Sequence, residues 1–289
     1  MNDAQKTRLL GLVAEAEQPG GSDVLPSFSW PSDDVVAFAA THGLDVAFVN
    51  LAMFLAIGDA DHWRQLAGNL VPGHGTRRIT VGWMDWLWSD PQSGAARLVC
   101  DPARRLDGEA VGALHRRDAA GDAVDRGEWR RVRYALSAIP DEGPIAAAAI
   151  GVAAAAAWSL DAVPGAAADM ILAWKELLFT EIDVALDWDE EKEAASAERR
   201  ELMLAHAGEV ARAADGDGSA DLPGQPPSDA YQQAFGQALS QFAAANPSDL
   251  DRRNERRQEA YVRMYQLGRE ALLRQITSAA APSSAMQAA

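Results

Sequence analysis

The side chains that most often carry chemistry are few and widely spaced in this sequence. Its histidines are His42, His62, His74, His115 and His206. None of them has a second His, Cys or Glu at a recognised metal-ligand spacing. The single cysteine, Cys100, excludes an internal disulfide. No Gly-x-Ser-x-Gly elbow or phosphate-binding glycine loop occurs either. These observations favour a non-catalytic protein, for which we expect no cofactor and no metal ion.

Carboxylates, in contrast, are concentrated in one stretch of the chain. Over residues 181–193 the acidic side chains are Glu181, Asp183, Asp187, Asp189, Glu190, Glu191 and Glu193. Clustered charge accelerates association with an oppositely charged protein. We therefore predict that Glu181, Asp183, Asp187, Asp189, Glu190 and Glu191 bind a partner. The alternative is a metal-dependent, all-α enzyme that uses the same carboxylates as ligands for a divalent cation.

Three tryptophans lie close together in the segment "ITVGWMDWLWSDP", residues 79–91. At helical spacing Trp83 and Trp86 share one face, whereas Trp88 lies on another. The pattern is typical of a helix that is wrapped by other helices. The alternative is an exposed aromatic patch that anchors a partner. For that reason Trp86 and Trp88 join the candidate partner-binding residues.

Length and net charge limit the classes of protein to which this chain can belong. The chain has 289 residues, 48% of them hydrophobic, so it can bury a sizeable core. Its net charge of −16 disfavours nucleic acids and anionic membranes as partners. The first residues, "MNDAQKTRLLGLVAEAEQ", read as an amphipathic helix and not as a signal peptide. We expect a cytoplasmic protein.

The segment "GPIAAAAIGVAAAAAWSLDAVPG", residues 143–165, carries no charge before Asp161. A membrane span needs about 20 predominantly apolar residues, and this run is shorter and mostly alanine. Alanine has the highest helix propensity, and Pro144 suits a first helical turn. A helix without charge on any side belongs in a core. We therefore expect it to be the central helix of an all-α bundle.

Apolar residues recur at helical spacing along most of the chain, and almost no alternating pattern of strands is present. The expected helices cover residues 3–17, 32–42, 44–57, 59–70, 79–91, 92–106, 109–138, 144–160, 165–188 and 190–213. A break is expected near Gly121 or Gly127. In the segment "DRGEWRRVRYALSAIP", residues 125–140, the spacing places Trp129, Val132 and Leu136 inward and Arg130, Arg131 and Arg133 outward.

Composition divides the chain into four parts. Residues 1–213 are expected to form a helical body, and residues 214–228 a flexible acidic linker. Residues 229–278 carry two apolar stripes separated by "NPSD", which predicts a helical hairpin that must pack on the body or on a partner. Within it, "RRNERR" (252–257) suits local ion pairs on a solvated helix. The tail, residues 279–289, is expected to be disordered.

The stretch from about residue 107 to residue 179 resembles a known group of proteins. A Trp-bearing charged helix ("DRGEWRRVR"), an alanine-saturated helix ("AAAAIGVAAAAAW") and a second Ala-rich helix ("GAAADMILAW") follow in order. This succession is similar to alanine-rich, all-helical immunity proteins of bacterial toxin systems, and to helical proteins encoded near type VI secretion genes. The resemblance implies a cytoplasmic bacterial protein that binds another protein, and it carries no site residues with it.

The sequence therefore favours an immunity, adaptor or chaperone factor for a bacterial toxin or secreted effector, with a basic protein as the partner. Besides the metal-dependent enzyme, one further alternative is a structural protein that forms homo-oligomers through the hairpin.

Overall fold

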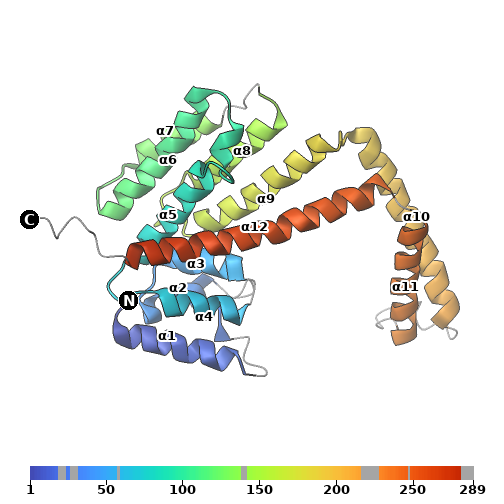
Figure 1. Cartoon of the computed structure of the whole chain (residues 1–289), viewed down its shortest axis with the longest axis horizontal. Coiled ribbons are helices and arrows are strands. Elements are labelled where there is room, and N and C mark those ends of the chain that lie inside the picture. The colour runs from blue at the N-terminus through green and yellow to red at the C-terminus, as the bar shows by residue number, and fades with distance from the viewer. Residues whose placement is uncertain are drawn as a thin grey trace, which may run out of the picture. The chain divides into compact units, whose positions relative to one another are not determined.

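A computed structural model of the chain describes residues 1–18, 24–26, 32–56, 59–137, 142–215, 228–246 and 248–280. Within these ranges all regular secondary structure is helical and no strand is present, which confirms the predicted all-α class. The chain divides into two compact units (Figure 1). The main unit comprises residues 1–180 and 261–289, and the inserted unit comprises residues 181–260.

The main unit contains eight whole α-helices of the described chain, one short 3-10 helix and parts of two more helices. They are α1 (Asp3–Ala16), α2 (Ser32–His42), α3 (Val46–Ala56), α4 (Ala60–Asn69), α5 (Thr76–Ser89), η2 (Ala95–Leu98), α6 (Pro102–Ala120), α7 (Arg126–Leu136), α8 (Pro144–Ala156), most of α9 (Ala166–Ala185) and the later residues of α12 (Asp249–Ala280). The inserted unit holds α10 (Glu190–Asp215), α11 (Asp229–Ala245) and the first residues of α12.

Local sequence signals explain where many of these helices begin and end. Asp101 caps α6 by accepting a hydrogen bond from the Ala103 amide, and Pro102 occupies the first helical position. The helix ends at Gly121, whose φ of 93° is the left-handed conformation that glycine adopts without strain. Asp125 and Glu128 then form a capping box that starts α7.

The predicted helix over residues 92–106 is wrong. Asp90 accepts hydrogen bonds from the amides of Gln92 and Ser93, and this side-chain turn ends α5. Only the short η2 follows before Pro102 starts α6. The hydrogen bonds that the Asp90 side chain accepts therefore favour a turn over a continued helix.

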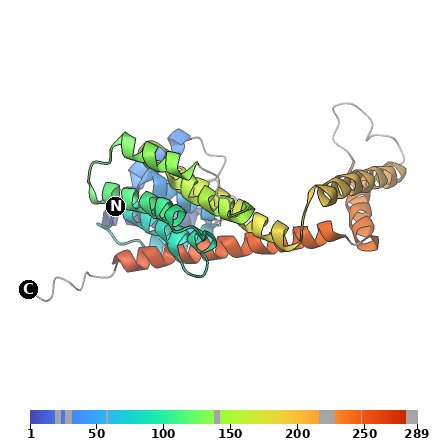
Figure 2. The same ribbon diagram turned by 90° about the horizontal axis from the view of Figure 1, so that it is seen from above.

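The alanine-rich helix α8 packs within the main unit as predicted. It contacts α5, α6, α7 and η2, and α6, α7 and α8 lie side by side (Figure 2). No residue from Ile145 to Ala157 is exposed. Small side chains on all sides let the neighbouring helices approach closely.

The core of the main unit is built from large side chains. Phe48, Trp63 and Trp83 are fully buried or nearly so, and α1 packs against α2 and α4 (Figure 1). The later part of α12 completes this core with Met264, Leu272 and other buried residues. This apolar stripe of the predicted hairpin is therefore buried within the chain itself, so a homo-oligomer through it is not supported.

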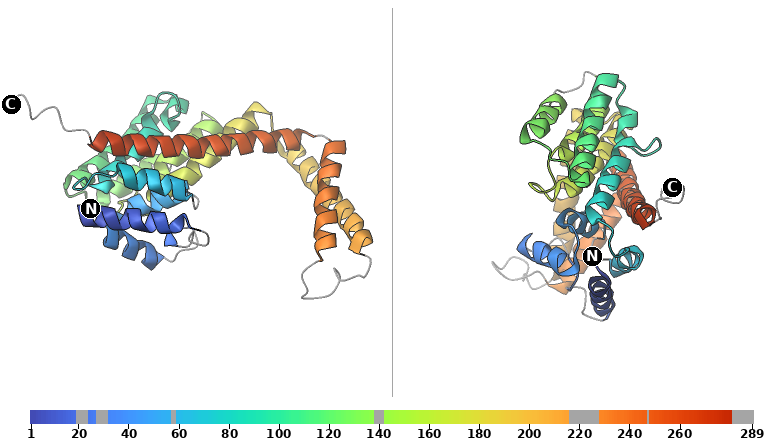
Figure 3. Two further views of the ribbon diagram at one scale, coloured as in Figure 1. Left: turned by 60° about the horizontal axis from the view of Figure 1, so that its bottom comes forward. Right: turned by 90° about the vertical axis from the view of Figure 1, so that its left-hand side faces the viewer.

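In the inserted unit, α10 and α11 run antiparallel and side by side (Figure 3). Among the described residues of this unit the buried apolar side chains are small, namely Ala207, Ala211 and Ala238. Phe242 is half-buried, and its ring neighbour His206, 5.7 Å away between centroids, is exposed. The unit therefore has little apolar core of its own.

The two units do not coincide with the predicted division of the chain. The boundaries fall near residues 180 and 260, whereas the sequence suggested a body ending at residue 213 and a separate hairpin over 229–278. The reason is that α11 packs on α10, while the later half of α12 packs in the main unit. Most of the predicted linker, residues 216–227, and of the predicted tail, residues 281–289, lies outside the described residues.

Among the described residues, no single helix combines the length and apolarity that a membrane span requires. Taken together, α2 and α3 are long and apolar enough, but the chain bends by 111° at the break between them.

Candidate interaction surfaces

The structure separates the acidic cluster into internal and exposed members. Asp183, on the last turns of α9, is internal to the inserted unit. Its carboxylate accepts hydrogen bonds from Arg253 Nε at 2.8 Å and Arg253 Nη2 at 2.7 Å. Arg257 Nη2 donates a third at 2.5 Å. A carboxylate held by two guanidinium groups is neutralised within its own unit.

Arg253 is the centre of this network. It is only 8% exposed, and its Nη1 also donates to Glu193 Oε2 at 2.8 Å. Its guanidinium lies 4.1 Å from the ring centroid of Trp188, whose Nε1 donates to the same Glu193 oxygen. We refer to Asp183, Trp188, Glu193, Arg253 and Arg257 as the Arg253 cluster.

These contacts keep the two carboxylates ionised. Burial by itself would raise the pKa of Asp183, but the hydrogen bonds from Arg253 and Arg257 outweigh it and lower that pKa. The pKa of Glu193 is lowered by its hydrogen bonds from Trp188 and Arg253. The Arg253 cluster is therefore charged but internally compensated, so Asp183 has no free oxygen pair to offer a partner.

Four predicted residues remain at the surface. Asp187 lies just after α9, Asp189 caps α10 by accepting the Lys192 amide at 2.9 Å, and Glu190 and Glu191 occupy the first turn of α10. All four are exposed, and none forms an ion pair within the described part of the chain. We refer to these four residues as the acidic surface. Glu181, also predicted, is half-buried.

The two tryptophans of the predicted site belong to the core of the main unit. Trp88 is 6% exposed. Trp86 is half-buried, and it packs edge-on against Trp174 at 5.7 Å between ring centroids. Arg274 lies over its other side at 5.9 Å. The structure therefore places Trp88 where a protein partner cannot touch it, and the interpretation of α5 as a wrapped helix holds.

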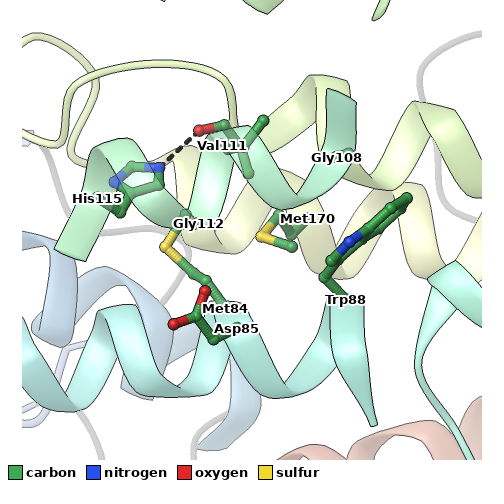
Figure 4. Close-up of a pocket in the computed structure, with 10 residues that line it drawn as sticks. Met84, Asp85, Trp88, Gly108, Val111, Gly112, His115 and Met170 are labelled. Carbon is green, nitrogen blue, oxygen red and sulfur yellow. Dashed lines mark hydrogen bonds between the residues drawn. The ribbon is translucent and has the colours of Figure 1, made fainter. Parts of the chain in front are cut away.

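Trp88 lines a small pocket between α5, α6, α8 and α9 (Figure 4). Its volume is about 20 Å³, which is room for one or two water molecules and not for a substrate. His115 closes one end, with Nε2 at 2.7 Å from the carbonyl oxygen of Ala156. Burial lowers the pKa of His115, so the ring is neutral at pH 7.

The described residues contain no group of three or more His, Cys, Asp or Glu side chains that could hold a metal ion. Of the acidic side chains of residues 181–193, Asp183 and Glu193 meet at the guanidinium of Arg253, and Asp187, Asp189, Glu190 and Glu191 are exposed. The geometry thus gives no support to the metal-dependent alternative.

Sequence reasoning missed the role of Arg253 and Arg257. Their four-residue spacing within "RRNERR" suggested ion pairs along one helix, yet both reach Asp183, which is 70 or more residues away in the chain. The available signal was the apolar neighbour Trp188 beside Asp187 and Asp189, because an indole in an acidic run favours a stacked arginine.

Comparisons with protein-family models, with curated proteins and with solved structures find no match to this chain.

Proposed function

We propose that this protein binds a positively charged protein partner through the acidic surface, Asp187, Asp189, Glu190 and Glu191. The observation that carries the proposal is that these carboxylates are exposed and free of ion pairs, whereas Asp183 and Glu193 beside them are compensated. An immunity or adaptor factor for a basic toxin or secreted effector would use such a surface.

The distribution of charge supports this choice of unit. Residues 181–260 contain eighteen acidic and eight basic side chains, whereas the rest of the chain contains twenty-four acidic and eighteen basic ones. The excess of negative charge per residue is therefore several times greater in the inserted unit. Such a field attracts a cationic protein and raises its association rate, and salt screens it.

The test is a charge-neutralising variant that preserves shape. In D187N/D189N/E190Q/E191Q every carboxylate becomes an amide of the same size. Asn is an efficient N-cap at position 189, and it tolerates the φ of 48° at position 187. The control, E15Q/D33N/D34N/E109Q, removes the same charge from exposed positions of the main unit.

Each protein is immobilised and exposed at about 50 mM salt to a lysate of the source cells, and captured proteins are identified and purified for affinity measurement. We expect one basic protein that the wild type and the control bind equally, and that the variant binds at least tenfold more weakly. Equal binding by all three proteins, or capture of acidic proteins only, would refute the proposal.

A further inference from the structure

The outer face of α7 carries a charge opposite to that of the molecule as a whole. Arg126, Arg130, Arg131 and Tyr134 are exposed on this helix, while Trp129 and Leu136 are buried on its inner side. Tyr134 is 82% exposed, the highest fraction among the large apolar side chains of the described residues. We refer to Arg126, Arg130, Arg131 and Tyr134 as the arginine face.

The other arginines around α7 form ion pairs or hydrogen bonds, whereas those of the arginine face form no ion pair among the described residues, and Arg131 attracts Glu128 only over a longer distance. Arg117 pairs with Glu128 at 2.7 Å, and Arg133 donates to the Ala157 carbonyl and lies over the Trp158 ring. No carboxylate of the described chain lies within 4.0 Å of the guanidinium groups on the arginine face. The two nearby acids are already engaged, since Asp125 and Glu128 form the capping box.

This arrangement works against the stability of the helix itself. Arg126 and Arg130 are four residues apart, so like charges face each other on one side of the helix. Arg126 also lies in the first turn, where the helix dipole disfavours a cation. Apart from the attraction between Arg131 and Glu128, nothing in the helix compensates these charges, and a local rule broken in this way is typical of a functional surface.

We infer that the arginine face binds a short acidic segment of a partner protein, rich in Asp and Glu. Guanidinium groups match carboxylates in a paired, planar geometry, and exposed Arg and Tyr are the residues that most often anchor interfaces. The net charge of −16 does not prevent this, because at physiological salt the field of distant charges is screened beyond about 8 Å.

The size of the face favours a short peptide segment over a nucleic acid. An eleven-residue helix is about 16 Å long, which spans only a few carboxylates of an extended peptide. A longer polyanion would extend past the start of α7, where Asp122 and Asp125 are exposed, and would meet negative charge there. The arginine face is distinct from the acidic surface, so this inference stands independently of the proposed function.

The experiment measures binding of a fluorescein-labelled, eight-residue Asp/Glu peptide to the full chain by fluorescence anisotropy. The variant R130E/R131E reverses the charge of the face. The control R8E/R263E makes the same change in net charge at two other exposed arginines of the main unit that form no ion pair. A third variant, Y134A, removes the ring and leaves the charge unchanged.

We expect R130E/R131E to weaken binding at least tenfold, R8E/R263E less than twofold, and Y134A about threefold to tenfold with an unchanged salt dependence. Equal losses in R130E/R131E and R8E/R263E would overturn the inference, because any arginine would then serve. So would the absence of peptide binding to the wild type at 50 mM salt, or tighter binding of an eight-nucleotide single-stranded DNA. Unchanged far-ultraviolet circular dichroism confirms that each variant is folded.

Discussion

The two units of this molecule are stabilised in different ways. The main unit buries tryptophan, phenylalanine and leucine side chains almost completely, with Trp63 and Trp83 at 1% and 0% exposure. In the inserted unit the buried apolar side chains of the described residues are alanines, and a buried arginine, Arg253, lies at the centre of an ion-pair cluster. One unit therefore depends mainly on apolar burial, and the other on specific polar contacts.

This difference bears on function. The inserted unit is held by a few ion pairs and hydrogen bonds. It can therefore present the acidic surface without burying a large apolar area. A unit with a dense core can tolerate an arginine face without ion pairs, because apolar burial stabilises α7 from its inner side.

The largest expected effect is the loss of a core tryptophan. Trp83→Ala should lower the free energy of unfolding by about 3–5 kcal/mol, because it leaves a cavity and removes the hydrogen bond from Nε1 to the Gly268 carbonyl at 2.9 Å. Leu106→Ala, at a side chain that is 62% exposed, should change it by less than about 0.5 kcal/mol. Denaturant unfolding measures both, and a loss below about 1 kcal/mol for Trp83→Ala would contradict the burial.

The matching change in the inserted unit is Arg253→Met. It leaves the carboxylates of Asp183 and Glu193 without their shared partner, which should cost about 2–3 kcal/mol locally. Amide hydrogen exchange in α10 and α11 should accelerate about 30-fold or more, with little change in α3 and α5. The neighbouring, exposed Arg252→Met is the control, and uniform acceleration across both units would refute the distinction between them.

The two units should lose stability at different pH values as the solution is acidified. In the main unit, burial and then Arg269 lower the pKa of His62 to about 4, against the opposing effect of Asp59. The unfolded chain takes up this proton near pH 6.5, so the stability is complete above pH 6.5 and falls as the pH approaches 4.

The expected loss at pH 5 is about 2 kcal/mol for His62, and the lowered pKa values of His42 and His115 act in the same direction. In the inserted unit, the lowered pKa values of Asp183 and Glu193 maintain the cluster until about pH 4, where the carboxylates of the unfolded chain protonate. Urea unfolding of the wild type and of His62→Gln at pH 7 and pH 5 measures the difference. Equal pH dependence in both proteins would rule out His62 as its source.

The smallest effect concerns two glycines of α6 that face α5. A β-carbon at Gly108 would lie 2.0 Å from the Trp88 ring, whereas one at Gly112 would meet only the ends of two surface side chains, the Asp85 carboxylate and the Arg116 guanidinium. Gly108→Ala should therefore destabilise by about 1–2 kcal/mol even after the gain in helix propensity. Gly112→Ala should be close to neutral. Thermal unfolding of the two variants compares them, and a similar shift in both would contradict the close contact.

Most helices could be predicted from the sequence, because helical periodicity and capping residues depend only on residues close together in the chain. The stretch 143–165 predicted α8, and Gly121 was one of two expected breaks. The error over residues 92–106 arose where Asp90 competes for backbone amides. The division into units was not accessible, because it depends on long-range pairing of α12.

The candidate surfaces were accessible only in part. Composition located the carboxylates of residues 181–193, but it could not show that Asp183 faces two arginines whereas Asp187 and Glu190 face solvent. The sequence favoured a wrapped helix for Trp88 but left an exposed patch open, because periodicity does not reveal which helices cover a side chain.

The interrupted main unit has a consequence for biosynthesis. Leu55 and Trp83 emerge from the ribosome early, but the segment that covers them, around Gly268, is translated some 185 residues after Trp83. Throughout that interval the nascent chain lacks the helix α12, which contacts Leu55 and Trp83 in the folded protein. Chaperone occupancy should therefore persist until that helix is released.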